Sequence, residues 1–263
     1  MNIISSKDNE IVKRIRKLKE KKYRDMENVY IVEGIKMLRE AIESKTAIEQ
    51  IIICDDCEKS DGIPKDLMYE MAKYDCVYVT SKIFKYISEV QSPQGVLTIV
   101  EKNNSKPINY KEDIIIALDG LQDPGNLGTI LRTLDSANLS QVIVSKTTVD
   151  AYNPKVVRST MGAIFRINVI EVDNLKETLL EMKTHNYKVM CTDLKAKENI
   201  YSIDYNKKIL VIGNEANGVS KEILNIADEK IIIPMLGKTE SLNASVATSI
   251  IVYEYVRRKI QNK

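Results

Sequence analysis

The chain has 263 residues, of which 44% are hydrophobic and 29% are charged. This composition is typical of proteins with a packed core, and it excludes disordered and fibrous classes. The sequence contains no apolar run of the roughly 18 residues that a membrane-spanning helix needs. We therefore expect one large domain or two of ordinary size, and no membrane partner.

The net charge of +2 conceals an uneven distribution of basic side chains. Residues 1–26 contain nine Lys or Arg residues and only four Asp or Glu residues, whereas acidic residues predominate over the rest of the chain. A basic segment of this kind favours a polyanionic partner. The candidate contacts for that partner are Lys13, Arg14, Arg16, Lys17 and Lys21.

The pattern of residues 1–100 predicts a small α/β domain. Residues 11–24 place Ile11, Ile15 and Leu18 on one face of a helix and basic residues on the others. Such a helix could simply be solvated, or it could dock on the domain and also touch phosphate. Strands are expected at 29–32, 51–53, 76–79 and 95–100, and helices around 37–41, 67–73 and 81–87.

Residues 101–112 are polar, contain one proline and lack periodicity, so they predict a linker. A second α/β pattern occupies residues 113–263. Its alternation of strands and helices predicts a mostly parallel sheet covered by helices. Strands are expected at 114–118, 141–145, 167–170, 188–192, 209–212 and 230–233, and helices at 127–137, 154–163, 175–183 and 242–258.

Three loops of this second domain are rich in Gly, Asn and small polar residues: 119–128, 213–218 and 234–245. Each follows a predicted strand, and ligands of parallel sheets bind at the carboxyl ends of the strands. Any one loop could be an ordinary turn, since Gly and Asn are common in turns. Three such loops at equivalent strand ends predict a functional site.

Several enzyme classes lack their sequence signatures. No G-x-G-x-x-G stretch occurs, which argues against a dinucleotide site. Residues 237–239 (GKT) resemble the end of a phosphate-binding loop, but Ile232 stands where that motif needs its first Gly. The single histidine, His185, lies in a polar stretch and favours a surface position, so a Ser-His-Asp triad has little support.

The four cysteines favour free thiols in a cytoplasmic protein. Cys54 and Cys57 have zinc-knuckle spacing, but no second pair and no nearby His accompanies them. An incidental pair at a strand end is the favoured interpretation, and we predict no metal. The N-terminus has no apolar segment typical of a secretory signal.

The three loops resemble the motifs of the SpoU/TrmH family of SPOUT RNA methyltransferases. Residues 121–137 (LQDPGNLGTILRTLDSA) are similar to its first motif, 211–218 to its second and 233–247 to its third. Residues 153–163 are similar to a further family segment, although Thr160 replaces the usual Ser, and Lys238-Thr239 stands as an insertion-like stretch before Glu240. Order and spacing agree across residues 113–258.

The N-terminal part is similar to the substrate-binding domain of this family. The similarity lies in residues 32–41 (VEGIKMLREA) and 92–96 (SPQGV), and it is less specific than the other motifs. That domain resembles small α/β ribosomal proteins that bind RNA. We therefore predict a division into an RNA-binding domain (1–100), a linker (101–112) and a catalytic domain (113–263).

The resemblance implies a trefoil-knotted catalytic domain that binds S-adenosylmethionine and forms a homodimer. It also implies methylation of a ribose 2′-hydroxyl in structured RNA, and the extra N-terminal domain favours 23S ribosomal RNA. A transfer RNA substrate, methylation of a base, or a non-catalytic RNA-binding or ribosome-assembly protein with the same fold are the alternatives. DNA is not expected, because it lacks the 2′-hydroxyl.

The resemblance also assigns roles to individual residues. Arg132 would pair with the substrate phosphate and stabilise the developing alkoxide, or act as a transiently neutral base, although a guanidinium is normally protonated. Glu215 would position the ribose or a loop N–H group. Asn126, Ser241 and Asn243 complete the catalytic set and could also cap helices. The expected cofactor-binding residues are Thr192, Ile212, Gly213, Asn214, Gly218, Ile233, Met235, Ser241 and Leu242.

Overall fold

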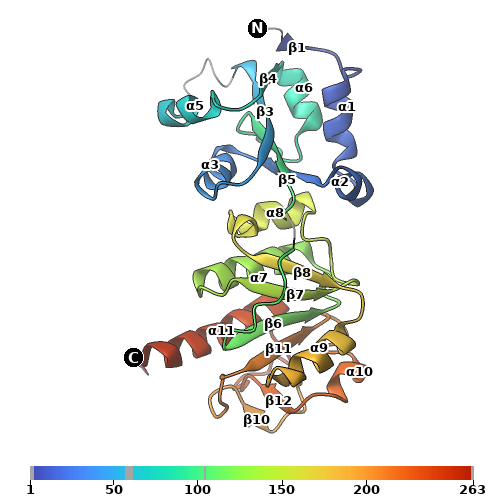
Figure 1. Ribbon diagram of the computed structural model, residues 1–263, viewed down its shortest axis with the longest axis vertical. Coiled ribbons are helices and arrows are strands. Elements are labelled where there is room, and N and C mark those ends of the chain that lie inside the picture. Colours follow the sequence, from blue (N-terminus) through green and yellow to red (C-terminus); the bar gives the residue numbers. More distant parts are fainter. Residues whose placement is uncertain (1–2, 57–61, 104, 262–263) are drawn as a thin grey trace. The chain divides into compact units, whose positions relative to one another are not determined.

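The computed structural model describes residues 3–56, 62–103 and 105–261 (Figure 1). The chain divides into two compact units. The N-terminal unit comprises Met1–Asn104 together with Tyr152–Phe165, and the C-terminal unit comprises Ser105–Ala151 and Arg166–Lys263. The sequence placed residues 152–165 in the second domain, whereas they pack with the first unit. Over the described ranges, none of the helices has the length and apolar character needed to cross a membrane.

The N-terminal unit contains a mixed sheet of five strands in the order β1-β4-β3-β5-β2. Strands β1, β4 and β3 are parallel, whereas β5 runs antiparallel to both β3 and β2. The strands are β1 (Ile3–Ile4), β2 (Val29–Glu33), β3 (Ile48–Cys54), β4 (Cys76–Val79) and β5 (Val96–Glu101).

Helices cover both faces of this sheet, because alternate side chains of a strand point to opposite faces. Ile52 and Cys54 of β3 join the core beneath helices α1 and α6, while Ile51 and Ile53 join the core beneath α3 and α5. The helices that cover the sheet in the described part of residues 1–104 include α1 (Glu10–Lys17), α2 (Lys21–Glu27), α3 (Ile35–Glu43), α5 (Lys65–Met71) and α6 (Ser81–Ile87).

The single helix predicted over residues 11–24 is wrong, because the chain turns between α1 and α2. Arg24 explains the turn: its side chain is buried, and its Nη1 donates to the carbonyls of Leu18 at 2.9 Å and Lys19 at 2.6 Å. The guanidinium therefore satisfies backbone carbonyls that a continuous helix would have bonded itself. Periodicity alone cannot register a buried arginine of this kind.

Helix α8 (Pro154–Thr160) packs on β2 although it comes from the later part of the chain. Val156 and Val157 are buried, and the ring of Tyr152 lies 4.8 Å from that of Tyr30. The helix is shorter than predicted, since Met161 adopts a left-handed conformation and a 3-10 turn, η1 (Ala163–Phe165), follows.

The C-terminal unit contains a sheet of seven strands, all parallel, in the order β10-β12-β9-β11-β6-β7-β8. This confirms the predicted parallel sheet. The strands are β6 (Ile114–Asp119), β7 (Gln141–Ser145), β8 (Asn168–Val172), β9 (Lys188–Thr192), β10 (Glu198–Asn199), β11 (Lys208–Gly213) and β12 (Glu229–Ile232).

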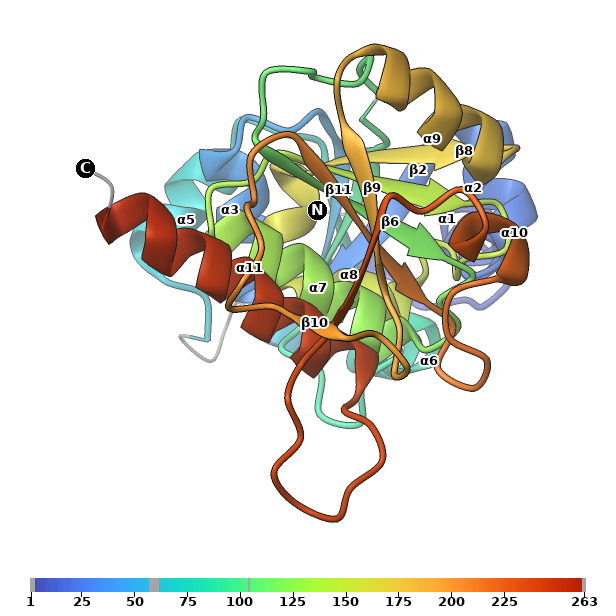
Figure 2. The ribbon, with the colours of Figure 1, turned by 90° about the horizontal axis from the view of Figure 1, so that it is seen from below.

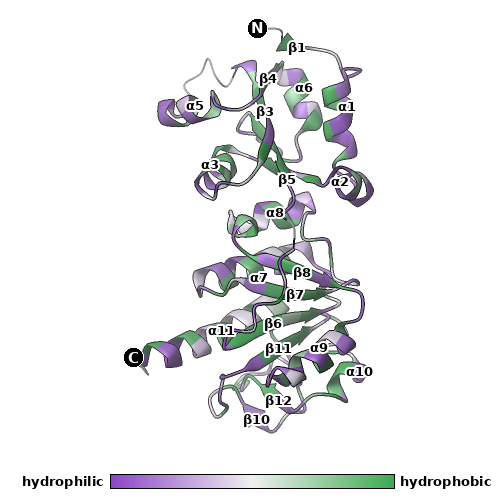
Figure 3. Ribbon diagram, viewed as in Figure 1, coloured by the Kyte–Doolittle hydropathy of each residue, from purple (hydrophilic) through white to green (hydrophobic). Residues whose placement is uncertain are grey.

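Helices lie on both faces of this sheet (Figure 2). Helices α9 (Leu175–Thr184) and α10 (Lys221–Leu224) cover the core formed by one set of alternating strand residues. Helices α7 (Pro124–Ser136) and α11 (Ala244–Gln261) pack against each other on the other face. The central strands are strongly hydrophobic, as expected for a sheet buried on both sides (Figure 3).

Candidate functional site

The carboxyl ends of β9, β11 and β12 open into a cleft of about 640 Å³, here called the strand-end cleft. Its walls come from the loops that follow these three strands and from the first turns of α11. The chain between β12 and α11 extends away from the body of the unit as a long loop (Figure 2). The volume lies within the range of small-molecule and cofactor sites.

All nine predicted cofactor-binding residues line this cleft. Glu215 and Asn243 line it too, whereas Asn126 and Arg132 do not belong to its walls. The sequence missed Asp193, Leu194 and Lys195, which follow β9. Their position at the carboxyl end of a parallel strand was the available signal.

Gly213 is a glycine for steric reasons. A Cβ atom at this position would lie 2.0 Å from the backbone carbon of Gly218 and from the nitrogen of Val219. The chain doubles back here, because Asn214 and Gly218 exchange two backbone hydrogen bonds of 3.0 and 2.9 Å. The side-chain Nδ2 of Asn214 also donates to the carbonyl of Gly120 at 2.8 Å, which ties the loop to the end of β6.

Glu215 connects the second motif (211–218) to the first (121–137) by hydrogen bonds. Its carboxylate accepts from the backbone N–H groups of Gln122 and Asp123, both at 3.0 Å, and from Nδ2 of Asn126 at 2.9 Å. Partial burial pushes the pKa of Glu215 upward, but these three donors outweigh it, so the pKa lies below its ordinary value. The carboxylate is thus ionised at neutral pH and engaged with the protein itself.

Asn126 does not cap α7, which was one of the two roles that the sequence allowed. Asp123 caps α7, since its Oδ1 accepts from the backbone N–H of Asn126 at 2.9 Å. Asn126 is buried, and its Oδ1 accepts from Nδ2 of Asn243 at 2.9 Å and from Oγ of Ser245 at 3.3 Å. With Glu215 on its Nδ2, Asn126 connects all three motif loops in one hydrogen-bonded network.

Asn243 caps α11, one of the two roles that the sequence allowed. Its Oδ1 accepts from the backbone N–H of Ser245 at 2.9 Å. Ser241 lies before the helix, where it is exposed and lines the strand-end cleft. Ser245 completes the buried network. Serine is common in the first turn of a helix, so its sequence position gave no signal of this role.

Arg132 is exposed on α7. Within the described part of the chain its guanidinium has neither an ion pair nor a hydrogen bond. An unpaired guanidinium presents five N–H donors in a fixed fork that matches a phosphate. Its neighbour Thr133, in contrast, is engaged with Ser249 of α11 at 2.9 Å.

The described residues contain no group of three or more side chains suited to hold a metal ion. Cys54 is buried, and Cys57 lies outside the described residues. Cys191 is adjacent in sequence to Thr192, which lines the cleft. Burial raises the pKa of the Cys191 thiol to about 12. A thiol that stays protonated at neutral pH is a poor nucleophile.

The five basic candidates of the N-terminal segment differ in their surroundings. Arg14 binds Glu27 at 2.6 Å and Glu49 at 2.5 and 2.9 Å, and Lys13 pairs with Glu10 at 3.1 Å. Arg16 lies over the ring of Tyr86, Lys17 stands 5.8 Å from the ring centre of Tyr23, and Lys21 is exposed. Two carboxylates therefore occupy the guanidinium of Arg14, whereas Arg16 and Lys17 have aromatic neighbours.

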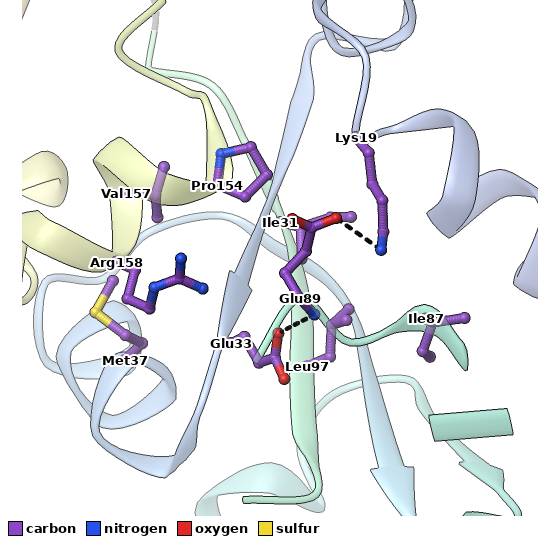
Figure 4. Close-up of a pocket in the computed structure, with 10 residues that line it drawn as sticks. All are labelled: Lys19, Ile31, Glu33, Met37, Ile87, Glu89, Leu97, Pro154, Val157 and Arg158. Carbon is purple, nitrogen blue, oxygen red and sulfur yellow. Dashed lines mark hydrogen bonds and ion pairs between the residues drawn. The ribbon is translucent and has the colours of Figure 1, made fainter. Parts of the chain in front are cut away.

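A small cavity lies in the N-terminal unit between β2, β5 and α8 (Figure 4). Its walls are mostly apolar side chains such as Ile31, Leu97 and Val157. At its edge Lys19 pairs with Glu89 at 2.7 Å. The cavity has room for about one water molecule, so it is not a ligand site.

Comparisons with known proteins agree with this geometry. Residues 113–253 match the SpoU rRNA Methylase family, and residues 9–98 match the MRM3-like substrate binding domain. The chain is 33% identical over 254 residues to the Bacillus subtilis 23S rRNA (guanosine(2553)-2′-O)-methyltransferase RlmP, covering 96% of this chain and 98% of the relative.

Solved structures show the same fold. An rRNA methyltransferase from Sinorhizobium meliloti with bound AdoMet is 30% identical, with a TM-score of 0.85 and 98% coverage of both chains. An RNA 2′-O ribose methyltransferase is 25% identical, with a TM-score of 0.82, over 98% of this chain and 100% of that one.

Proposed function

The chain belongs to the SpoU rRNA Methylase family, and from this membership we propose that it methylates a ribose 2′-hydroxyl of 23S ribosomal RNA in the cytoplasm. The observation that carries the proposal is the network in which Asn126 joins Glu215, Asn243 and Ser245. It fixes three motif loops around one cleft. The similarity to RlmP, whose name specifies a 23S rRNA 2′-O site, favours ribosomal over transfer RNA.

The strand-end cleft suits S-adenosylmethionine, which the similar structure from Sinorhizobium meliloti binds. Ile212, Ile233 and Leu242 offer apolar contacts, while Thr192 and Asn214 offer polar ones. This mixture of an apolar wall and a few polar groups is typical of sites for nucleoside-sized ligands. When bound, the cofactor supplies a methyl group whose bond to sulfur breaks as a bond to the ribose oxygen forms.

The residues of the chain must orient the ribose and assist the loss of the 2′-hydroxyl proton. A free 2′-hydroxyl is a weak nucleophile, so its proton has to leave as the new bond forms. We assign Arg132 to the substrate phosphate and to the negative charge that develops on the ribose oxygen, since its guanidinium is unpaired in the described part of the chain. Glu215, Asn126 and Asn243 are positioning residues, because their polar groups bind one another.

We also propose that the protein works as a homodimer through α7 and α11. The exposed side chains Val246, Tyr253 and Ile260 recur on one face of α11, with exposed fractions of 46%, 49% and 68%. The spacing of seven residues, about two helical turns, places them in one stripe. Sedimentation velocity should give a dimer, and Tyr253→Glu should give a monomer, whereas a monomeric wild-type protein would contradict this part of the proposal.

The function is tested by incubating the protein with transcribed 23S ribosomal RNA and S-adenosylmethionine labelled in its methyl group. We expect label at one nucleotide, and resistance to alkaline cleavage at that linkage, because a 2′-O-methyl group blocks it. Label in an alkali-sensitive nucleotide would indicate base methylation and overturn the proposal. A thermal shift with S-adenosylmethionine but no label in ribosomal RNA would direct the search to transfer RNA, and no shift at all would indicate a non-catalytic RNA-binding protein.

A further inference from the structure

Helices α1 and α6 pack together on one face of the N-terminal sheet. Val12 and Ile15 of α1 are buried in the same core as Ile83, Phe84 and Ile87 of α6. Because their apolar sides are used in this core, the polar sides of both helices form one outer surface. We define the α1–α6 face as Arg16 of α1, Lys82, Lys85 and Tyr86 of α6, and Lys7, which precedes α1 and lies over the ring of Tyr86.

The ring of Tyr86 contacts two cations on this face. The Nζ of Lys7 lies 4.3 Å from the centre of its ring, and the guanidinium carbon of Arg16 lies 4.9 Å from it. Nη1 of Arg16 also donates to the backbone carbonyl of Tyr86 at 3.4 Å. Cation–π contacts of this kind hold long side chains in place. An ordered pair of cations loses less side-chain entropy when an anion binds.

Helix α6 adds two more cations beside this pair. Lys82 and Lys85 are exposed, and Lys82 precedes Tyr86 by four residues, so the two share one side of the helix. The helix contains no acidic residue. Neither lysine forms a salt bridge or hydrogen bond with another described residue.

Several other cations of the N-terminal unit are engaged with carboxylates. Arg14 is bound by two glutamates, and Lys19 pairs with Glu89. On the opposite face of the sheet, Arg39 pairs with Asp66 and Lys73 pairs with Glu70. The α1–α6 face therefore differs from its surroundings in holding several basic groups that acidic partners do not neutralise.

We propose that the α1–α6 face is the surface of the N-terminal unit that binds RNA phosphates, with Lys82 and Lys85 as direct contacts and Tyr86 as the residue that positions Lys7 and Arg16. This inference rests on the proposed RNA substrate and moves the contact surface from the basic residues at 13–21 to a face that α1 and α6 share. Phosphate contacts fix the orientation of an RNA without specifying its sequence. The face thus positions a structured RNA and leaves the choice of nucleotide to other contacts.

The first experiment measures the affinity of the full chain for transcribed 23S ribosomal RNA, and for a 20-base-pair RNA duplex, as a function of salt. Lys82→Ala/Lys85→Ala should weaken binding of both about tenfold near physiological salt and reduce the slope of log K against log salt by roughly two, about one for each phosphate contact. The matched control is Lys36→Ala/Lys65→Ala, which removes two exposed lysines from α3 and α5 on the opposite face. The control should leave both quantities unchanged.

The second experiment separates the ring of Tyr86 from its hydroxyl. Tyr86→Leu should weaken RNA binding several-fold, since the apolar packing remains but the cations lose their ring. Tyr86→Phe should bind like wild type. The inference would be overturned if Lys82→Ala/Lys85→Ala changed neither the RNA affinity nor the slope of log K against log salt. It would also be overturned if Lys36→Ala/Lys65→Ala lost as much RNA affinity.

The two proposals can fail separately. Normal methyl transfer by an enzyme whose RNA affinity ignores Lys82 and Lys85 would overturn only the role of the α1–α6 face. A chain that binds RNA through this face but never methylates ribose would overturn only the proposed reaction. Circular dichroism and thermal unfolding of these variants should match the wild type, which shows that the N-terminal unit is folded, and their binding of S-adenosylmethionine should be unchanged.

Discussion

The strand-end cleft and the α1–α6 face achieve recognition by different means. The cleft is shaped by backbone: Gly213 lets the chain fold back on Gly218, and Glu215 and Asn126 bind the loops to one another. The α1–α6 face consists of long side chains. Two of its cations, Lys7 and Arg16, are held by contacts with the ring of Tyr86. The cleft tolerates little change in shape, whereas the face can lose one cation and keep the rest.

This difference follows from what each region has to hold. A cofactor must be placed to within a fraction of an ångström of the reacting hydroxyl. Phosphates of a folded RNA are met by charge, which acts over several ångströms and is weakened by salt. We therefore expect abrupt, local effects from changes at the cleft and graded, salt-dependent effects from changes on the face.

Arg132→Ala gives the largest effect that we expect. Methyl transfer should fall about 10²- to 10⁴-fold, as is typical when a group that stabilises transition-state charge is removed. Binding of S-adenosylmethionine should be nearly unchanged, because Arg132 does not line the strand-end cleft. Single-turnover kinetics and calorimetry measure the two quantities.

Arg132→Lys is the matched control. It keeps the charge but loses the planar fork, so only part of the rate should return. Loss of cofactor binding in Arg132→Ala, or full activity, would refute the role assigned to this residue.

Gly213→Ala tests whether backbone shape governs the cleft. The new Cβ would lie 2.0 Å from backbone atoms of Gly218 and Val219, so the loop must move. We expect affinity for S-adenosylmethionine to fall roughly 100-fold, equivalent to about 3 kcal/mol. Gly237→Ala is the control, since nothing lies within 4 Å of a Cβ there. Similar cofactor affinities in the two variants would break the contrast between cleft and face.

Asn126→Ala probes the network that unites the three loops. It leaves Nδ2 of Asn243 without its acceptor, removes one of the two acceptors of Ser245 Oγ, and takes one hydrogen-bond donor from Glu215. The free energy of unfolding should drop by about 1 to 3 kcal/mol, measured by urea denaturation. Asn217→Ala, on the exposed tip of the second loop, should change it little. Equal losses would mean that the network does not stabilise the unit.

The sequence predicted many of the regular elements, and it placed the expected cofactor-binding residues at strand ends that border one cleft. Strand β7 and helix α6 have the predicted bounds, and the expected cofactor-binding residues gather at one place. These features depend on local periodicity and on strand ends, both of which can be seen in a single sequence. The composition and strand-end position of the three loops already predicted a site, and the family resemblance added the expected reaction and residue roles.

What the sequence could not predict depends on tertiary contacts. The break between α1 and α2 requires Arg24 to bury its guanidinium, and the packing of α8 on β2 joins segments more than a hundred residues apart. The position of Asn126 inside the first turn of α7 depends on Asp123 taking the cap. Likewise, Lys82 and Lys85 stand out as candidates only once α6 is seen to lie beside α1.

The paired charges of the C-terminal unit predict a pH dependence of stability. Glu254 is buried on α11, and its hydrogen bond with Arg257, opposed by burial and reinforced by Arg258, lowers its pKa to about 2. A lowered pKa means that the stabilisation is complete above the ordinary value of 4.5 and is lost as the pH falls toward 2.

Glu254→Gln should therefore lower the free energy of unfolding at pH 7 by roughly 1 to 2 kcal/mol and flatten its decline between pH 4.5 and 2. Chemical denaturation at a series of pH values measures this. A decline as steep as that of the wild type would place the titrating group elsewhere. Arg257 and Arg258 bind Glu254 within α11. Their charges are therefore partly neutralised, whereas the charges of Lys82 and Lys85 are free to contact RNA.

Arg14→Ala gives the smallest effect and the sharpest contrast with the α1–α6 face. Arg14 lies on the same helix as Arg16, but Glu27 and Glu49 hold its guanidinium. The side chain is 30% exposed, so solvent weakens these ion pairs, and their loss should cost about 1 kcal/mol or less. The salt slope of RNA binding should stay as in the wild type, because a cation already neutralised by two carboxylates releases few counterions from RNA. If Arg14→Ala instead reduced the slope as much as Lys82→Ala/Lys85→Ala, the basic charge of α1 would act on RNA as a whole, and the distinction between paired and unpaired cations on this unit would not hold.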